Sequence, residues 1–226
     1  MKNEKRKEIK VLPINHRECY VWVLNKHYAK RKPRMQFCFG FYVDNLLEGI
    51  ITFGYPATPF VSRGLCGKEY EDSVLELNRL VINSGTPKNS ASYLIAQSIK
   101  LIPDKYKIIV SYADTSLNHI GYVYQATNFI YTGLTIPMKE WGVVGSNLHS
   151  QNVCKKKSLE ERRKDKKYKQ INRPQKHRYI LFRGNKKEKE ILKNKLNYDI
   201  LPYPKGKSSH YISPDITEKQ MVLFTK

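Results

Sequence analysis

Two polar side chains in the middle of the chain are well placed for chemistry. Asp114 closes a short apolar segment that is typical of a buried strand, and Tyr124 lies in a segment that can form the next helix. Open α/β sheets bind their ligands outside the carboxyl ends of the strands, so both side chains could face one crevice. The alternative interpretation is that Asp114 only caps the helix that follows it.

Two further pairs could contribute to a site. His27 and Tyr28 are adjacent, and an imidazole with a phenol could bind a metal ion or carry a proton. A surface pair without such a role is the commoner explanation. Glu76 and Arg79 lie three residues apart in a predicted strand, where alternation places them on opposite faces. One could face a ligand, or the two could form a salt-bridged strand edge.

The connection after this strand could bind an anion. Thr86 is predicted to be the N-cap of a helix, with Pro87 at its first position and Lys88 in its first turn. The free N–H groups and the dipole of a helix N-terminus favour phosphate. Every α/β protein has such connections, so a purely structural crossover is the alternative.

Hydrophobic periodicity and turn residues predict the elements that position these residues. In chain order we predict a helix at 19–25, a hairpin of strands at 37–43 and 46–53, a Gly- and Pro-rich loop at 54–68, a strand at 74–82, a helix at 87–102, a strand at 107–111, a helix at 118–128 and a strand at 129–135. Strands that alternate with helices predict an α/β fold with parallel neighbours in its later half.

The chain is strongly basic, with 41 Lys and Arg against 20 Asp and Glu and a formal net charge of +21. Such an excess favours a polyanionic partner, with nucleic acid as the first candidate and an anionic membrane as the second. A Lys-rich genomic bias is the alternative explanation. Residues 151–210 alone contain 20 Lys and Arg against 6 Asp and Glu. The excess is therefore localised, which weakens that alternative.

The charge distribution predicts three parts. These are a catalytic core at 10–150, a basic DNA-binding extension at 151–210 that packs on the core, and a tail at 211–226. In the extension, 155–157 and 162–169 could form a solvated helix or a charged linker, and 177–183 alternates like a strand. Tyr203, His210 and Tyr211 could stack on an unpaired base.

No segment approaches the roughly 20 apolar residues of a membrane span, and the N-terminus lacks the apolar core of a signal peptide. The four cysteines are scattered without a C-x-x-C pair, which argues against a zinc ribbon or a disulfide framework. We therefore expect a cytoplasmic protein with reduced thiols and no membrane partner.

Several segments together resemble the Mom family of phage DNA-modification proteins, which is similar to the GNAT acyltransferase fold. The resemblance covers roughly 15–206, and its longest specific run is 111–133. The segments that carry it are His27-Tyr28, Glu76-Leu77-Asn78-Arg79-Leu80, Pro87-Lys88-Asn89-Ser90-Ala91-Ser92, the run at 111–133, Lys176-His177-Arg178-Tyr179 and Leu201-Pro202-Tyr203-Pro204-Lys205.

The resemblance implies a GNAT-like mixed central sheet with flanking helices and a basic C-terminal extension. It implies transfer of a methylcarbamoyl-type group to N6 of adenine in double-stranded DNA, which protects phage DNA from restriction in the host cytoplasm. Acetyl-CoA is the expected donor, and an Fe(II) ion is a further expectation. The usual Gln/Arg-x-x-Gly-x-Gly/Ala signature of CoA-binding acyltransferases is absent, and 86–90 stands in its place.

Residue roles follow from this resemblance. We expect Asp114 to orient the adenine amine or accept its proton, Tyr124 to assist it, and Arg79 to hold the donor or a phosphate, with Tyr28 beside them. His27, Tyr28 and Asp114 are the expected metal ligands. The residues expected to bind the cofactor are Leu80, Val81, Ile82, Lys88, Asn89, Ser90 and Ala91.

Two other functions remain open at the level of sequence. One is a GNAT-type N-acetyltransferase that acts on a protein or a small amine, which would not need the basic extension. The other is a non-catalytic DNA-binding protein, in which the residues of 111–133 would serve only packing. Neither the sequence context of the target adenine nor the oligomeric state follows from the sequence.

Overall fold

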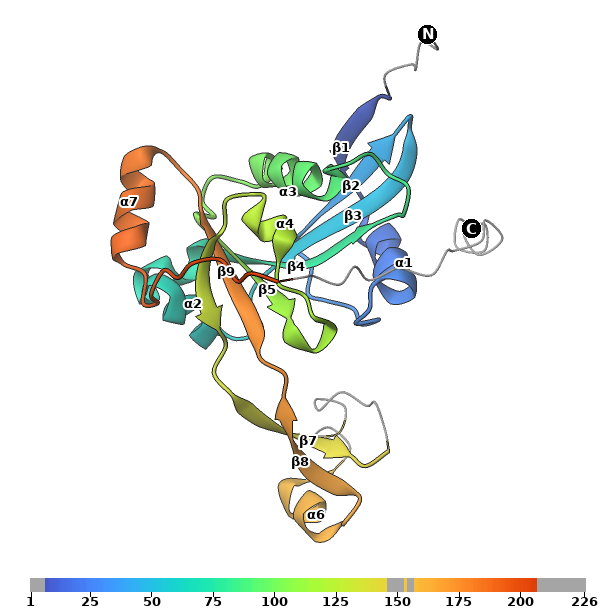
Figure 1. Cartoon of the computed structure of the whole chain (residues 1–226), viewed down its shortest axis with the longest axis vertical. Helices are drawn as coiled ribbons and strands as arrows, with labels where there is room; N and C mark the ends of the chain where they lie inside the picture. Colours follow the sequence, from blue (N-terminus) through green and yellow to red (C-terminus); the bar gives the residue numbers. More distant parts are fainter. Residues whose placement is uncertain (1–6, 146–152, 154–156, 207–226) are drawn as a thin grey trace.

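The computed structural model describes residues 7–145, 153 and 157–206. The chain forms a mixed α/β fold around a seven-stranded sheet, as the sequence predicts (Figure 1). In spatial order the strands are β1 (Ile9–Pro13), β2 (Phe37–Val43), β3 (Leu46–Gly54), β4 (Val74–Ile82), β5 (Ile108–Asp114), β9 (Lys176–Phe182) and β6 (Ile130–Leu134). Only β4 and β5 pair in parallel, and the other neighbours are antiparallel.

Helices cover both faces of this sheet. They are α1 (His16–Lys26), α2 (Pro59–Cys66), α3 (Ser90–Leu101), α4 (Tyr122–Gln125) and α7 (Lys186–Asn194), with 3-10 turns η1 (Lys68–Ser73) and η2 (Thr115–Leu117). A further helix, α6 (Leu159–Lys164), lies away from this sheet. Leu94 and Ile95 of α3 pack in the largest apolar cluster on one face. Leu65 of α2 and Leu192 of α7 pack on the other face, and α1 covers a third cluster there. Among the described residues, no helix has the length and apolar character needed to cross a membrane.

Two predicted local features need correction. The segment at 54–68, predicted to be a loop, contains α2, which begins at Pro59. Proline favours the first turn of a helix, so here it starts an element instead of interrupting one. The N-cap of α3 is Asn89 in the left-handed conformation and not Thr86, because the Ser90 hydroxyl donates to the Pro87 carbonyl and holds 86–89 in a turn.

Strand β9 changes the predicted organisation of the sheet. It lies between β5 and β6 and is antiparallel to both, so β6 is not the parallel neighbour of β5 that the order of elements predicts. Its residues fall within the predicted extension at 151–210. The main sheet therefore includes a strand from beyond the predicted core at 10–150. The predicted tail at 211–226, with Lys155 and Lys156, lies outside the described residues.

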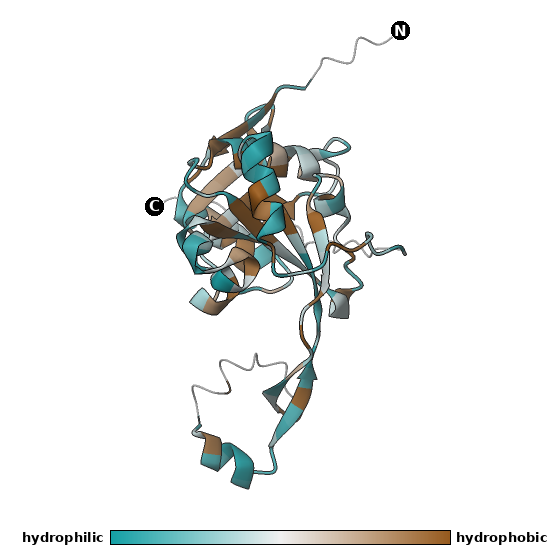
Figure 2. Cartoon of the chain, turned by 90° about the vertical axis from the view of Figure 1, so that its left-hand side faces the viewer, coloured by the Kyte–Doolittle hydropathy of each residue, from teal (hydrophilic) through white to brown (hydrophobic). Residues whose placement is uncertain are grey.

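A two-stranded ribbon projects from the body of the molecule (Figures 1 and 2). It consists of β7 (Met138–Val143) paired antiparallel with β8 (Tyr168–Arg173), and α6 lies at its far end. The predicted helix at 162–169 is shorter than expected. A capping box between Ser158 and Glu161 starts α6, which ends at Lys164, and the chain then turns into β8.

Candidate active site

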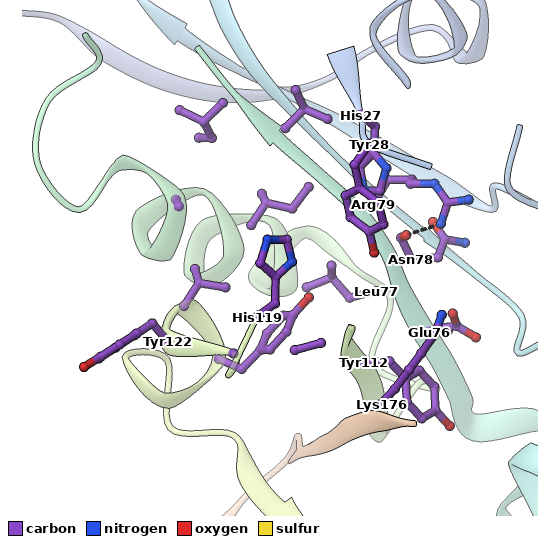
Figure 3. Close-up of a pocket in the computed structure, with 18 of the residues that line it drawn as sticks. His27, Tyr28, Glu76, Leu77, Asn78, Arg79, Tyr112, His119, Tyr122 and Lys176 are labelled. Carbon is purple, nitrogen blue, oxygen red and sulfur yellow. Dashed lines mark hydrogen bonds between the residues drawn. The ribbon is translucent and has the colours of Figure 1, made fainter. Parts of the chain in front are cut away.

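The separation of β4 and β5 creates the main pocket of the described structure. The two strands pair only from Val74 with Ile108 to Leu77 with Ser111, although β4 continues to Ile82 and β5 to Asp114. Where the pairing stops, the Ser111 hydroxyl donates to the Leu77 carbonyl at 2.8 Å. Beyond this point side chains from both strands, α1 and α4 surround a cavity of about 350 Å³ (Figure 3). That volume suits a small-molecule site.

A β-bulge at Asn78 sets the orientation of the β4 side chains. Thr52 pairs with Arg79 and Phe53 with Leu77, so Asn78 is an extra residue between them. The Asn78 amide group is held by Thr52 Oγ1, which donates to it, and by the Arg34 carbonyl, which accepts from it. An extra residue reverses the alternation of the strand. Glu76 and Arg79 therefore lie on the same face and both line the pocket, contrary to the predicted opposite faces.

The Arg79 guanidinium donates to two backbone carbonyl groups, and its Nε donor is available to a ligand. Nη1 donates to the Asn78 carbonyl at 2.5 Å and Nη2 to the Arg31 carbonyl at 3.2 Å. Nε is buried and has no hydrogen-bond partner among the described residues. A buried donor without a partner costs about 1–3 kcal/mol, so a bound acceptor at this position would relieve that cost.

His27 and Tyr28 line the pocket together. The His27 Nδ1 atom accepts from the Ala29 N–H at 3.0 Å, so a neutral ring carries its proton on Nε2. Burial lowers the pKa of His27 to about 3, and the charges of Arg79, His119 and Lys176 act in the same direction. The ring of Tyr28 lies 4.3 Å from His27 and 5.7 Å from His119 between centroids.

Glu76 supplies the single carboxylate among the described residues that line the pocket. Burial raises the pKa of Glu76, while the charges of Lys176 and Arg79 oppose that rise. Figure 3 shows Glu76 together with Tyr112 and Lys176, further along β4 from His27, Tyr28 and Arg79. A carboxylate with a raised pKa is suited to accept a proton near neutral pH.

Asp114 lies beside the pocket and not among its lining residues. Its Oδ1 accepts from the Ser116 N–H at 3.0 Å and from the Ser116 hydroxyl at 2.6 Å, and it forms the N-cap of η2. Its Oδ2 lies 3.7 Å from Nζ of Lys176, which does line the pocket. This is the capping role that the sequence left open as the alternative.

Of the predicted metal ligands, His27 and Tyr28 line the pocket and Asp114 lies beside it. His27 Nδ1 and Asp114 Oδ1 already accept hydrogen bonds from the chain. Across the described ranges, no three His, Cys, Asp or Glu side chains gather closely enough to hold a metal ion. Tyrosine is not among these four residue types, so an iron site formed by His27, Tyr28 and Asp114 stays a prediction.

Tyr124 lines the pocket from α4, as predicted. Its ring lies 5.5 Å from Phe129 and 5.2 Å from Tyr179 between centroids. Burial raises the pKa of Tyr124 to about 12, and a hydrogen bond with Ser111 opposes that rise. The phenol therefore stays protonated. Because the Ser111 hydrogen is already donated to the Leu77 carbonyl, Tyr124 donates to Ser111, and its oxygen remains able to accept a hydrogen bond in the pocket.

The predicted cofactor-binding residues divide into two groups. Leu80, Val81, Ile82 and Ala91 line the pocket. Lys88, Asn89 and Ser90 do not, and they form the turn that leads into α3. Sequence reasoning did not select Lys26, His119 or Tyr122, which also line the pocket. Figure 3 shows Tyr122 on the opposite side of the pocket from β4.

Comparisons with known proteins point to one family. A model of the Mom protein family matches residues 8–205. Methylcarbamoylase mom of Escherichia phage Mu is 28% identical over 207 residues, which cover 88% of this chain and 85% of that relative.

Solved structures of acetyltransferases show a loose likeness. An N-acetyltransferase from Staphylococcus aureus Mu50 is 16% identical with a TM-score of 0.44, over 77% of this chain and 98% of that chain. A GNAT family acetyltransferase from Elizabethkingia anophelis, with acetyl-CoA bound, is 12% identical with a TM-score of 0.41, over 77% of this chain and 98% of that chain.

Proposed function

The chain belongs to the Mom protein family, and on this premise we propose that it adds a methylcarbamoyl-type group to N6 of adenine in DNA. Its relative from phage Mu is named a methylcarbamoylase. Such a modification would shield phage DNA from restriction. The proposed partner is double-stranded DNA, which the net charge of +21 favours.

The pocket between β4 and β5 is the observation that carries this proposal. It combines a carboxylate on Glu76, neutral aromatic groups on His27, Tyr28 and Tyr124, and an anchored cation on Arg79. The N6 amine of adenine is inaccessible inside a duplex, so the base must leave the stack, at a cost of about a few kcal/mol. A pocket with several aromatic side chains offers stacking surfaces that offset this cost.

Glu76 is the side chain that we assign to the proton. The adenine amine must lose a proton as it forms its new bond, and a carboxylate whose pKa is raised by burial can accept that proton near neutral pH. Tyr124 keeps its proton in a hydrogen bond to Ser111, and its oxygen can orient the adenine amine by accepting a hydrogen bond. Asp114 then acts through Lys176 as a positioning residue.

An acetyl-CoA-type thioester is the proposed donor of the carbon atoms; it would release the CoA thiol as its leaving group, and an amine co-substrate would supply the amide nitrogen of the transferred group. Leu80, Val81, Ile82 and Ala91 would form the apolar wall beside the thioester. The edge of β4 that faces β5 has no strand partner beyond Leu77 among the described strands, so its backbone can pair with an extended ligand. The buried Arg79 Nε offers a further donor to a carbonyl or a phosphate.

Mass spectrometry of nucleosides from cells that express the chain tests the function. We expect a modified deoxyadenosine with the wild-type chain. Glu76→Gln keeps the shape of the side chain but cannot accept the proton, so modification should fall by about 10²–10⁴-fold. The matched variant Asp114→Asn should retain activity within about tenfold, because Asn keeps an acceptor for Ser116 and an N-cap for η2 and removes only the charge beside Lys176.

Other outcomes would redirect the assignment. If Asp114→Asn is inactive while Glu76→Gln is active, with both folded by circular dichroism, Asp114 is the proton acceptor. Unmodified DNA with soluble wild-type protein would contradict the proposed reaction. It would favour a non-catalytic DNA-binding protein, whereas acylated protein or small amines would favour an ordinary N-acetyltransferase.

A further inference from the structure

The ribbon of β7 and β8, together with α6, forms a separate basic element that we call the arm (138–173). Its described residues, 138–145, 153 and 157–173, contain nine Lys and Arg against four Asp and Glu. Figure 2 shows the described part of the arm as mostly hydrophilic and set apart from the body. So many positive charges on an exposed element repel one another and do not stabilise the fold, so they indicate an anionic partner.

Cross-strand pairing divides the ribbon into two faces. Partners that lie opposite each other in an antiparallel pair point to the same side. Met138 pairs with Arg173, Glu140 with Ile171 and Gly142 with Lys169, so these residues share one face. Trp141 pairs with Gln170 and belongs to the other face.

The helix α6 lies against the Trp141 face. The guanidinium of Arg162 lies 5.5 Å from the centre of the Trp141 ring, and Arg162 Nε donates to the Ser158 carbonyl at 3.1 Å. Arg162 is buried, unlike the exposed Arg163 and Lys164 beside it. Because α6 covers the Trp141 face of the ribbon, the opposite face is the one that a DNA partner can contact.

The opposite face combines charge with exposed apolar side chains. Lys169 and Arg173 are exposed, and Arg173 lies 4.0 Å from Glu140, which leaves its side chain 46% exposed. Ile171 is 48% and Met138 56% exposed. Cations that bind phosphate, with apolar groups between them that contact bases or sugars, are the combination that DNA-binding elements use.

The arm is rooted at the rim of the pocket. Its strands continue from β6 and β9 in the main sheet, and the connection is closed by three hydrogen bonds. Thr135 N–H donates to the Lys176 carbonyl at 2.9 Å, Lys176 N–H to Thr135 Oγ1 at 3.0 Å, and Gln175 Nε2 to the Thr135 carbonyl at 2.6 Å. Lys176 also lines the pocket. A duplex held by the arm would therefore lie next to the pocket.

We infer that the arm holds double-stranded DNA by inserting its Lys169–Arg173 face into the major groove. This inference rests on the proposed function and adds the surface that presents the substrate to the pocket. The major groove, about 12 Å wide, admits a two-stranded β-ribbon. A single strand has no such groove, so the inference commits to duplex DNA.

Equilibrium binding of a short duplex at several salt concentrations tests the arm. The double variant Lys169→Gln/Arg173→Gln should weaken binding by at least about tenfold near physiological salt. It should lower the log–log salt slope by about 1.8, since each lost phosphate contact removes about 0.9. The matched control Lys187→Gln/Lys189→Gln removes the same charge from exposed positions of α7 and should keep the wild-type slope.

Three results would overturn the inference. The first is that the arm variant binds duplex DNA with the same affinity and the same salt slope as the wild type. The second is that the α7 control loses as much duplex affinity as the arm variant. The third is an equal or larger loss on a single strand of the same sequence, which would assign the arm to unpaired DNA. Nucleoside analysis of the wild type reports separately on the proposed reaction, because binding needs no modification of adenine. Failure of one is therefore distinguishable from failure of the other.

Discussion

At the scale of single residues, the pocket holds a neutral imidazole among cations. His27 is buried, and Arg79, His119 and Lys176 all oppose its protonation. Its Nδ1 atom is already an acceptor for the Ala29 N–H. Protonation would place a second hydrogen against that donor, so the folded state depends on the neutral ring.

The free energy of unfolding should therefore decrease as the pH is lowered. Because the pKa of His27 is about 3 in the folded state and about 6.5 when unfolded, the unfolded state binds the extra proton between these values. The contribution of neutral His27 to the free energy of unfolding should be fully present above about pH 6.5. It should be lost as the pH falls toward 3, by up to about 1.4 kcal/mol per pH unit. Urea titrations at several pH values measure this.

The matched variant His27→Asn keeps an acceptor for the Ala29 N–H but cannot be protonated. Its stability should depend less steeply on pH than that of the wild type across the same range. His177, whose pKa burial also lowers, is present in both proteins and cancels in the difference. Parallel curves for the two proteins would show that His27 does not titrate as described.

Sequence alone located much of the pocket but not the roles within it. Tyr28, Arg79 and Tyr124 line the pocket as the resemblance implied. Glu76 was placed on the wrong face because a bulge at Asn78 cannot be seen in strand alternation. The contacts of Asp114 with Ser116 and Lys176 depend on the turn of η2 and on the register of β9, which local patterns do not specify.

At the scale of elements, α4 brings Tyr122 and Tyr124 to the pocket and depends on the glycine before it. Gly121 has a φ of +76°, and a Cβ there would overlap the ring of Tyr179. That ring is fully buried, and its hydroxyl bonds to the Ile120 carbonyl and to Gln125. The ring therefore cannot move aside without breaking these bonds.

Gly121→Ala should destabilise the fold by more than its backbone conformation alone explains. A left-handed conformation costs a non-glycine residue about 1–2 kcal/mol. The control Gly85→Ala has a similar φ of +82° but meets nothing within 4 Å. Thermal unfolding should show a larger loss for Gly121→Ala. Equal losses would mean that Tyr179 does not restrict this position.

The elements themselves were predicted best where local rules act. The hairpin turn at Asp44 and Asn45 was found because both residues tolerate the positive φ that they adopt. The placement of β9 was not found, because β5 and β9 are far apart in sequence and adjacency in the chain is the main guide to pairing.

At the scale of the whole molecule, part of the positive charge lies on an element, the arm, that does not contribute to the apolar clusters of the body. The arm is connected to the main sheet at Thr135, Gln175 and Lys176. The apolar clusters that stabilise the body draw on no residue of the arm. The body should therefore fold without it, although strand β9 is indispensable.

Replacing 137–174 with a two-residue turn would join β6 and β9 as a hairpin. We expect the thermal unfolding midpoint to stay close to that of the wild type, because no described residue of the three apolar clusters is removed. DNA binding should weaken strongly and lose much of its salt dependence. A variant that fails to fold, or that binds duplex like the wild type, would contradict this division.

The position of β9 also constrains how the protein is made. Strand β6 pairs only with β9 among the described strands, and β9 lies more than forty residues further along the chain. Domains form as the chain leaves the ribosome, so β6 must wait without a partner until residues 176–182 emerge. Lys176 of the pocket arrives at the same time. A nascent chain therefore cannot complete its site before residues 176–182, in the last quarter of its sequence, have been translated.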